Sequence, residues 1–282
     1  MPGTLFVVAT PIGNLEDITA RALRVLGEVS LIAAEDTRRT AQLLARYAIA
    51  TPTTSLHGHN EERKSASLVG RLTRGENLAL VSDAGTPTVS DPGTHLIAAA
   101  IAAGARVEPI PGPSAALAAL AASGLPAETF LFLGFPPIKA KARSAWFDTL
   151  VAAGRTVVFF EAPHRIRATL EQLSARAGDC QIVIARELTK IHEELVRGPI
   201  SKVLPSLQTA RGEFTVVADI GHATHLMSRA LAGDAEIATE FGVMTHNDNL
   251  TRREAISALA RRHSRTPNDV YAAIERSKKL VE

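Results

Sequence analysis

The feature that most constrains the fold of this chain is an alternation, in its first half, of short apolar runs with amphipathic stretches of helical length. The apolar runs predict strands at residues 5–9, 31–34, 77–82 and 106–110. The intervening stretches predict helices at residues 20–26, 40–47, 61–72 and 95–103. Buried strands that alternate with helices are typical of an α/β domain whose largely parallel sheet is covered on both faces.

A polar or glycine-proline loop directly follows each of these predicted strands, at residues 10–14, 35–38, 83–87 and 111–114. In parallel sheets, ligands bind outside the carboxyl ends of the strands. Glycine permits a close approach of the backbone to a ligand, and proline fixes the path of a loop. The four loops therefore predict a binding site along one rim of the sheet.

The second half of the chain predicts another α/β lobe and a helical tail. Residues 122–126 have the composition of a boundary, and new strands are predicted at 130–134, 156–160, 181–185 and 214–220. We expect a first lobe over residues 1–120, a mixed α/β second lobe over 121–222, a polar linker over 223–249, and a basic helical tail over 250–282. Within the tail, Thr251 and Glu254 form a capping box, and Pro267 suits the first turn of a second helix.

Positive charge is local rather than global, because the net charge of the 282 residues is only +2. Any contact with RNA must come from basic patches, and the tail carries the clearest one. The candidate RNA-binding residues there are Arg252, Arg253, Arg261, Arg262, Arg265, Lys278 and Lys279. A solvated helix face is the alternative explanation of this charge.

The single cysteine, Cys180, excludes an internal disulfide framework and favours a reducing compartment, so we expect a cytoplasmic protein. No apolar run approaches the roughly 18 residues of a membrane span, and no membrane partner is expected. Dinucleotide and P-loop fingerprints are missing from the sequence. His57 and His59 alone make a poor chelate, so no metal site is expected.

The loop sequences resemble those of the tetrapyrrole-methylase-type (class III) methyltransferases, in particular their rRNA (cytidine-2′-O)-methyltransferase branch. The matching segments run in order along the chain at residues 8–15, 33–38, 57–61, 80–87, 90–93, 109–115, 160–165 and 185–190. The histidine-containing and Arg-Glu-Leu-Thr-Lys segments favour the RNA branch. Gly58, Thr88 and Ala162 depart from the expected Glu, Gly and Ser.

This resemblance implies a two-lobe fold with a mainly parallel first sheet, a mixed second sheet and a small C-terminal helical unit. It also implies S-adenosyl-L-methionine as cofactor, bound between the lobes, and a homodimer. The implied substrate is a cytidine ribose in the decoding region of small-subunit rRNA, as free rRNA or within an assembled small ribosomal subunit, and no metal is implied.

For the cofactor we favour residues in three of the strand-end loops. Asp83 would accept hydrogen bonds from the cofactor's ammonium or ribose, and Ser114 would cap a helix whose first amides suit a carboxylate or an adenine edge. Ordinary turn and cap roles are the alternative. The candidate cofactor-binding residues are Pro11, Asp83, Ala84, Gly85, Thr86, Ser114 and Ala115.

The sequence constrains the residues that contact the methyl acceptor less than those that hold the cofactor. Methyl transfer to a hydroxyl requires alignment of the reacting atoms and loss of the hydroxyl proton. The candidate catalytic residues are Asp36, Arg38, His59, Glu61 and Glu161. Each has a structural alternative: an ion pair within a loop for the first two, solvated neighbours of a helix cap for the next two, and a buried network for the last.

Two other functions stay open at this stage. A small-molecule methyltransferase of the same fold would act on a tetrapyrrole-like acceptor, against which the basic tail and the RNA-branch segments count. A non-catalytic RNA-binding or ribosome-assembly protein would explain the tail but not the convergent loops. Transfer of label to rRNA and affinity for the cofactor would distinguish the three.

Overall fold

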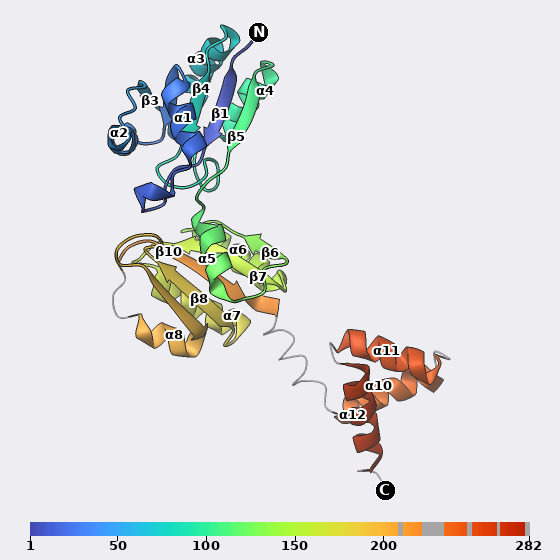
Figure 1. Cartoon of the computed structure of the whole chain (residues 1–282). Coiled ribbons are helices and arrows are strands. Elements are labelled where there is room, and N and C mark those ends of the chain that lie inside the picture. Colours follow the sequence, from blue (N-terminus) through green and yellow to red (C-terminus); the bar gives the residue numbers. More distant parts are fainter. Residues whose placement is uncertain (208–210, 222–233, 247–249, 264–265, 280–282) are drawn as a thin grey trace.

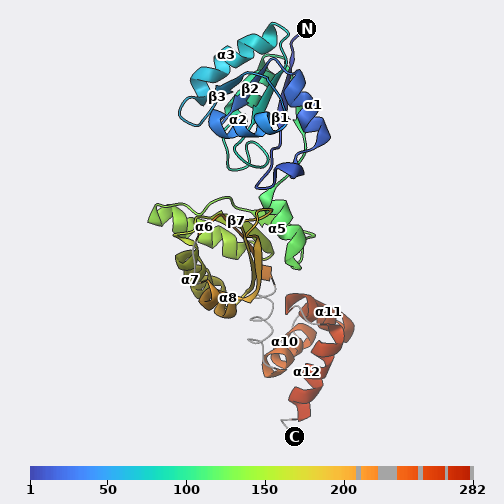
Figure 2. The ribbon, with the colours of Figure 1, turned by 60° about the vertical axis from the view of Figure 1, so that its left-hand side comes forward.

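The computed structural model describes residues 1–207, 211–221, 234–246, 250–263 and 266–279. It contains two five-stranded sheets, each packed against helices, and a C-terminal group of helices (Figures 1 and 2). The predicted two-lobe α/β fold is confirmed. No helix in the described ranges is both long enough and apolar enough to span a membrane.

The first sheet is entirely parallel and has the strand order β3-β2-β4-β1-β5. Its strands are β1 (Thr4–Val8), β2 (Leu31–Ala34), β3 (Thr53–Ser55), β4 (Leu78–Val81) and β5 (Arg106–Ile110). The apolar pattern does not predict β3, because its three residues are polar and half-buried at the sheet edge.

Apolar residues of the first sheet alternate between two separate cores. One face packs against α1 (Ala20–Glu28) and α2 (Thr37–Arg46), and the other packs against α3 (Glu61–Thr73) and α4 (Thr94–Ala102). Both faces are buried, which explains why β2 and β4 are continuous apolar runs. Because the strands are parallel, the loops that follow them leave from the same rim.

The second sheet is mixed and has the order β6-β7-β10-β8-β9. β6 pairs in parallel with β7, and the other pairs are antiparallel. Its strands are β6 (Phe130–Phe132), β7 (Thr156–Glu161), β8 (Gln181–Arg186), β9 (Glu194–Pro199) and β10 (Phe214–Asp219). The helices α6 (Ala140–Ala152), α7 (Ile166–Ala177) and α8 (Ile200–Ser206) cover one face.

The other face of the second sheet is covered by α5 (Ala115–Ser123), which corrects the predicted lobe boundary at residue 120. Ala116, Ala119 and Leu120 are buried against strands of the second sheet. α5 is apolar on nearly all sides, so its sequence does not reveal which sheet it covers. The chain passes from one lobe to the other within residues 111–114, just before α5 (Figure 1).

The predicted linker over residues 223–249 is also wrong in part, because α10 (Asp234–His246) occupies its second half. Residues 222–233 and 247–249 lie outside the described part. α10 packs against α11 (Arg252–Arg262) and α12 (Pro267–Lys279) through Ile237, Leu259, Val270 and Ile274. In the sequence the polar neighbours of Ile237, Phe241 and Met244 obscure their helical spacing.

The caps of the two tail helices agree with the sequence. Glu254 Oε2 accepts from Thr251 N at 2.9 Å, and Thr251 Oγ1 accepts from Glu254 N at 3.4 Å, which is the predicted capping box. Thr266 and Asp269 exchange the same pair of hydrogen bonds on either side of Pro267, at the start of α12.

Candidate functional site

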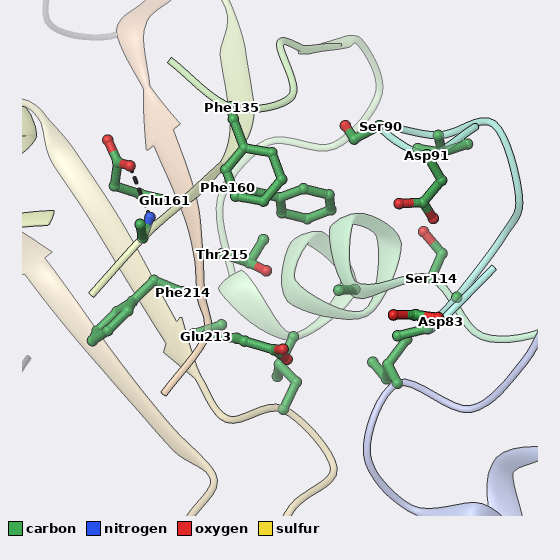
Figure 3. Close-up of a pocket in the computed structure, with 18 of the residues that line it drawn as sticks. Asp83, Ser90, Asp91, Ser114, Phe135, Phe160, Glu161, Glu213, Phe214 and Thr215 are labelled. Carbon is green, nitrogen blue, oxygen red and sulfur yellow. Dashed lines mark hydrogen bonds between the residues drawn. The ribbon is translucent and has the colours of Figure 1, made fainter. Parts of the chain in front are cut away.

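A cavity of about 450 Å³ lies between the strand-end loops of the first lobe and the carboxyl end of β7 and the start of β10 in the second lobe (Figure 3). Small-molecule sites usually measure about 300–1,000 Å³, so the cavity is large enough for a nucleoside-sized ligand. Its lining residues in the first lobe come from the loops after β1, β2 and β4 and from the first turn of α2, and the start of α5 adds Ser114 and Ala115.

Backbone hydrogen bonds tie these loops together. Thr10 and Gly85 exchange hydrogen bonds of 2.9 and 3.0 Å, which join the loop after β1 to the loop after β4. Thr86 Oγ1 donates to the carbonyl of Pro113 at 3.2 Å, which adds the loop before α5. Gly85 has a φ of +82°, a conformation that favours glycine. The cavity wall is therefore held in place before any ligand arrives.

Six of the seven predicted cofactor-binding residues line this cavity: Asp83, Ala84, Gly85, Thr86, Ser114 and Ala115. Pro11 is buried and lies outside the lining, where its neighbour Ile12 is found instead. Ser114 is the N-cap of α5, and its hydroxyl accepts from Leu117 N at 3.5 Å. The assignment of these residues to the cofactor stays a prediction.

Asp83 is oriented by groups on the neighbouring strand end. Its Oδ1 accepts from the backbone amide of Asp36 at 2.9 Å, and its Oδ2 lies 3.4 Å from Arg39. Its own amide donates to Glu35 at 3.4 Å. The carboxylate is thereby fixed at the cavity wall with part of its hydrogen-bonding capacity left for a ligand.

Two further carboxyls beside Asp83 have raised pKa values. Burial, followed by the charges of Glu35 and Asp83, raises the pKa of Asp91 to about 6, against a hydrogen bond from Ser82 that lowers it. Burial, and then the charge of Asp83, also raises the pKa of Glu35. Three carboxyls and a single guanidinium, that of Arg39, line this side of the cavity, so it favours a cationic ligand.

Aromatic rings form the opposite wall. The ring of Phe135 is about half exposed, and its centroid lies 5.4 Å from that of Phe160. Phe132 packs edge-on behind Phe160 at 5.1 Å. Figure 3 shows Phe135 and Phe160 across the cavity from Asp91 and Ser114. A partly exposed ring with aromatic backing is suited to stacking on a planar ligand.

The predicted catalytic residues Asp36 and Arg38 do not line the cavity. Their side chains form an ion pair of 2.7 Å, and Asp36 caps α2 by accepting from Arg38 N at 2.8 Å. Hydrogen bonds from Arg38 hold the pKa of the Asp36 carboxyl well below its usual range. The structure thus contains the local ion pair that is the alternative explanation of Asp36 and Arg38.

His59 and Glu61 also lie away from the cavity. Glu61 Oε1 accepts from the amides of Gly93 and His95, at 3.0 and 2.8 Å, and so satisfies the start of α4. His59 is exposed, with its ring edge-on to His57 at 6.1 Å. Asn60 is the N-cap residue of α3, but its side chain accepts from the preceding His57 N at 2.9 Å and makes no capping hydrogen bond to the helix, so the helix-cap alternative is not confirmed for its side chain.

Glu161 lies at the cavity but points into the second lobe (Figure 3). Its side chain is fully buried, pairs with Arg165 at 2.7 Å, accepts from Thr169 Oγ1 at 2.5 Å, and lies 3.9 Å from Arg143. Its Oε1 also accepts from Ala162 N at 2.8 Å. This set of partners fits the network alternative, and a catalytic role of Glu161 stays a prediction.

A contact between the lobes closes one side of the site. Asn14 N donates to Thr189 Oγ1 at 2.9 Å, and a Cβ atom at Gly13 would lie 2.6 Å from Lys190 Cγ. Lys190 in turn pairs with Glu187 at 2.9 Å and with Glu213 at 3.0 Å. The Arg-Glu-Leu-Thr-Lys segment of the second lobe therefore packs against the loop after β1 of the first lobe.

The basic residues of the tail fall into three groups. Arg252 pairs with Glu275 at 2.8 Å, and Arg262 pairs with Glu240 at 3.1 Å. Arg253 is exposed and has no ion pair with the described residues. The side chains of Arg261, Lys278 and Lys279, and the whole of Arg265, lie outside the described part.

The cavity residues that sequence reasoning missed include Glu35, Arg39, Asp91 and Phe135. A signal existed for Asp91, because it lies in the segment 90–93 that carries the family resemblance. Glu35 precedes a residue that we favoured. Nothing in the local pattern around Phe135 marks it as a cavity residue. In the described part of the chain, no three His, Cys, Asp or Glu side chains are arranged to hold a metal ion.

Comparisons with known proteins agree with this architecture. The family model described as Tetrapyrrole (Corrin/Porphyrin) Methylases matches residues 4–204. Ribosomal RNA small subunit methyltransferase I of Xylella fastidiosa is 49% identical over 221 residues, which cover 77% of this chain and 81% of that protein. The protein of the same name from Escherichia coli O157:H7 is 45% identical over 225 residues, 78% of each chain.

Solved structures support the fold. Diphthine synthase aligns with a TM-score of 0.63 at 15% identity, covering 77% of this chain and 90% of that one. Uroporphyrin-III C-methyltransferase from Thermus thermophilus, complexed with S-adenyl homocysteine, aligns with a TM-score of 0.55 at 18% identity. That alignment covers 77% of this chain and 98% of the other.

Proposed function

The chain belongs to the tetrapyrrole methylase family and to its ribosomal RNA small subunit methyltransferase I group, and from this premise we propose that it methylates the ribose 2′-hydroxyl of a cytidine in the decoding region of small-subunit rRNA. It is an S-adenosylmethionine-dependent rRNA methyltransferase. The nucleotide and the 2′-oxygen rest on the resemblance of the loop segments.

The observation that carries the proposal is the pairing of an acidic wall with an aromatic wall in one cavity. S-adenosylmethionine has a positive sulfur and a positive ammonium group, which suit the carboxyls of Glu35 and Asp83. Its carboxylate or adenine edge suits the first amides of α5, beside Ser114. When bound, it supplies a methyl group that is already activated by the charge on sulfur.

The residues of the protein then have to position the acceptor and keep water away. The loops after β4 and before α5 would hold the donor, and Phe135 would stack on a nucleobase of the acceptor. No residue has to activate the leaving group. What the protein must still provide is a route for the hydroxyl proton.

The direct test is incubation of the protein with labelled S-adenosylmethionine and either free small-subunit rRNA or assembled small subunits. We expect label in a 2′-O-methylcytidine after digestion and mass spectrometry. Label in a tetrapyrrole acceptor but in neither rRNA sample would overturn the proposal. The comparison of the two rRNA samples also identifies the form of the substrate.

Replacement of Phe135 by alanine should weaken the use of the RNA substrate. Stacking of one base on an aromatic ring contributes about 1–3 kcal/mol, so KM for RNA should rise by about tenfold. Phe130→Ala is the matched control, because Phe130 is an exposed ring of the same sheet outside the cavity lining. A rise in the Kd for cofactor, with KM for RNA unchanged, would place Phe135 on the donor side instead.

Deletion of residues 234–282 should lower RNA affinity without changing cofactor affinity. The deletion removes all three tail helices, whereas a cut inside α10 would expose Ile237 and Phe241. Each lost phosphate contact reduces the salt dependence of binding by a slope of about 0.7–0.9, which filter binding at several salt concentrations measures. Equal RNA affinity and an equal slope in the truncated protein would show that the tail does not contact RNA.

The predicted homodimer is part of the proposal, since it follows from the resemblance. Light scattering should then give twice the chain mass of 29.9 kDa. The cytoplasmic location stays a prediction that rests on the single cysteine.

A further inference from the structure

Two of the carboxyls that line the cavity have no ion pair with the described residues and can take up a proton. Five acidic side chains line it, and three of them have a basic partner: Asp83 pairs with Arg39, Glu161 with Arg165, and Glu213 with Lys190. A paired carboxylate is a poor proton acceptor, because protonation breaks a charge-assisted hydrogen bond. The choice is therefore between Glu35 and Asp91.

The positions of Glu35 and Asp91 in the cavity distinguish them. Glu35 follows β2 and accepts from the amide of Asp83 at 3.4 Å, which ties it to the loops that would hold the donor. Asp91 lies further along the same loop and faces the second lobe (Figure 3). A Cβ atom at Gly134 would lie only 3.1 Å from Ser90 Oγ, so the segment before Phe135 touches the residue before Asp91.

The backbone holds Asp91 at this place. Thr88 and Ser90 both have left-handed conformations, with φ of +72° and +71°, and Gly93 has a φ of +127°. For residues other than glycine this conformation costs roughly 1–2 kcal/mol each, and such strain clusters at functional sites. The turns bring Asp91 back toward Ser82, at the end of β4.

Burial, and then the charges around it, raise the pKa of the Asp91 carboxyl toward neutral pH. The groups that face it are Glu35 and Asp83, both acidic, and Ser82, whose hydroxyl donates to it. Arg39 is turned toward Asp83 at 3.4 Å. Asp91 forms no ion pair in the described part of the chain. Its pKa of about 6 lets it be mostly ionised at neutral pH while still able to bind a proton.

We infer that Asp91 is the group that accepts the proton of the ribose 2′-hydroxyl, a role that rests on the proposed methyl transfer. As the ribose oxygen forms its bond to the methyl carbon, the bond from carbon to sulfur breaks and its electron pair stays on sulfur. The hydroxyl proton passes to the Asp91 carboxylate and then to solvent. Asp91 touches the acceptor and is in this sense a catalytic residue.

The test compares wild type with Asp91→Asn in single-turnover transfer to small-subunit rRNA across pH. The wild-type rate should rise with pH, since Asp91 must lose its proton to act, with a midpoint near its pKa of about 6. Asp91→Asn should lower the rate by about 100-fold to 1,000-fold and remove this pH dependence. Asp91→Glu, which keeps the carboxyl, should recover part of the rate and the rising limb.

Two readouts do not depend on transfer. Asp91→Asn should bind S-adenosylhomocysteine with the affinity of wild type in calorimetry, and carbon NMR of the wild-type carboxyls should find an aspartate titrating near pH 6 that is lost in the variant. Asp148→Asn is the control, because Asp148 lies on α6, is exposed and forms a surface ion pair with Arg176. It should match wild type in every assay.

The outcomes separate the two claims. If wild type itself transfers no label to rRNA, the proposed function fails. If wild type transfers and Asp91→Asn is equally fast with the same pH profile, only the role of Asp91 fails. Loss of S-adenosylhomocysteine affinity in the variant would make Asp91 a cofactor ligand, and the absence of an aspartate titrating near pH 6 would also overturn the inference.

Discussion

Asp83→Ala should raise the Kd for S-adenosylmethionine by about 10-fold to 100-fold, because a hydrogen bond to a charged group contributes about 1.5–3 kcal/mol. Asp83 faces the cavity and is held by the amide of Asp36 and by Arg39. The substitution removes a carboxylate from a wall that favours cations, and it leaves the positive charge of Arg39 without its partner. Calorimetry of the purified protein measures the change.

A second substitution separates charge from geometry. Asp83→Asn keeps an oxygen for the amide of Asp36 and removes only the charge, so its Kd should lie between those of wild type and Asp83→Ala. The thermal midpoint without ligand should be nearly the same for all three proteins, since Asp83 is only partly buried. An unchanged Kd in Asp83→Ala would remove Asp83 from the cofactor site.

Glu161→Ala should destabilise the second lobe by about 3–5 kcal/mol, which is the usual cost of removing one partner of a buried ion pair. The substitution leaves Arg165, whose side chain is largely buried, and Thr169 without their acceptor. Urea denaturation followed by circular dichroism measures the loss in the free energy of unfolding. Because Glu161 is a candidate from the sequence for catalysis, the result also decides between its two explanations.

The control for Glu161 is a carboxylate that pairs with arginine at the surface. Asp148 lies 2.7 Å from Arg176, and both side chains are exposed. Asp148→Ala should cost at most about 1 kcal/mol. Glu161→Gln keeps a polar atom, one oxygen and one nitrogen, at each carboxylate position, so it should lower the free energy of unfolding less than Glu161→Ala does. A Glu161→Ala protein as stable as wild type, yet unable to transfer methyl groups, would restore Glu161 as a catalytic residue.

The sequence predicts the first lobe well because its signals are local. β2 and β4 are continuous buried runs, β1 buries Leu5 and Val8 and β5 buries Ile110, and each of the four strands is followed by a loop of distinct composition. The parallel sheet then brings these loops together without further information. That is why Asp83 and Ser114, which lie in different loops, line one cavity, as the sequence predicts.

The errors arise where long-range packing decides. α5 is apolar all round, so only the tertiary structure shows that it covers the second sheet. Glu161 ends a strand, where a single step in register decides whether a side chain faces the cavity or the core. Glu61 begins a helix and serves the start of a different helix. Asp91 reaches the cavity through two left-handed residues that no periodicity reveals.

The passage of the chain between lobes just before α5 has a thermodynamic consequence. Each half of the ligand-binding surface belongs to a different hydrophobic core, and neither half is complete without the other. Melting of either core therefore abolishes affinity. A bound ligand must therefore shift the unfolding equilibrium of both cores by the same mass-action factor. Occupancy of the cavity by a small molecule, in addition to direct contact, joins the two lobes into one cooperative unit.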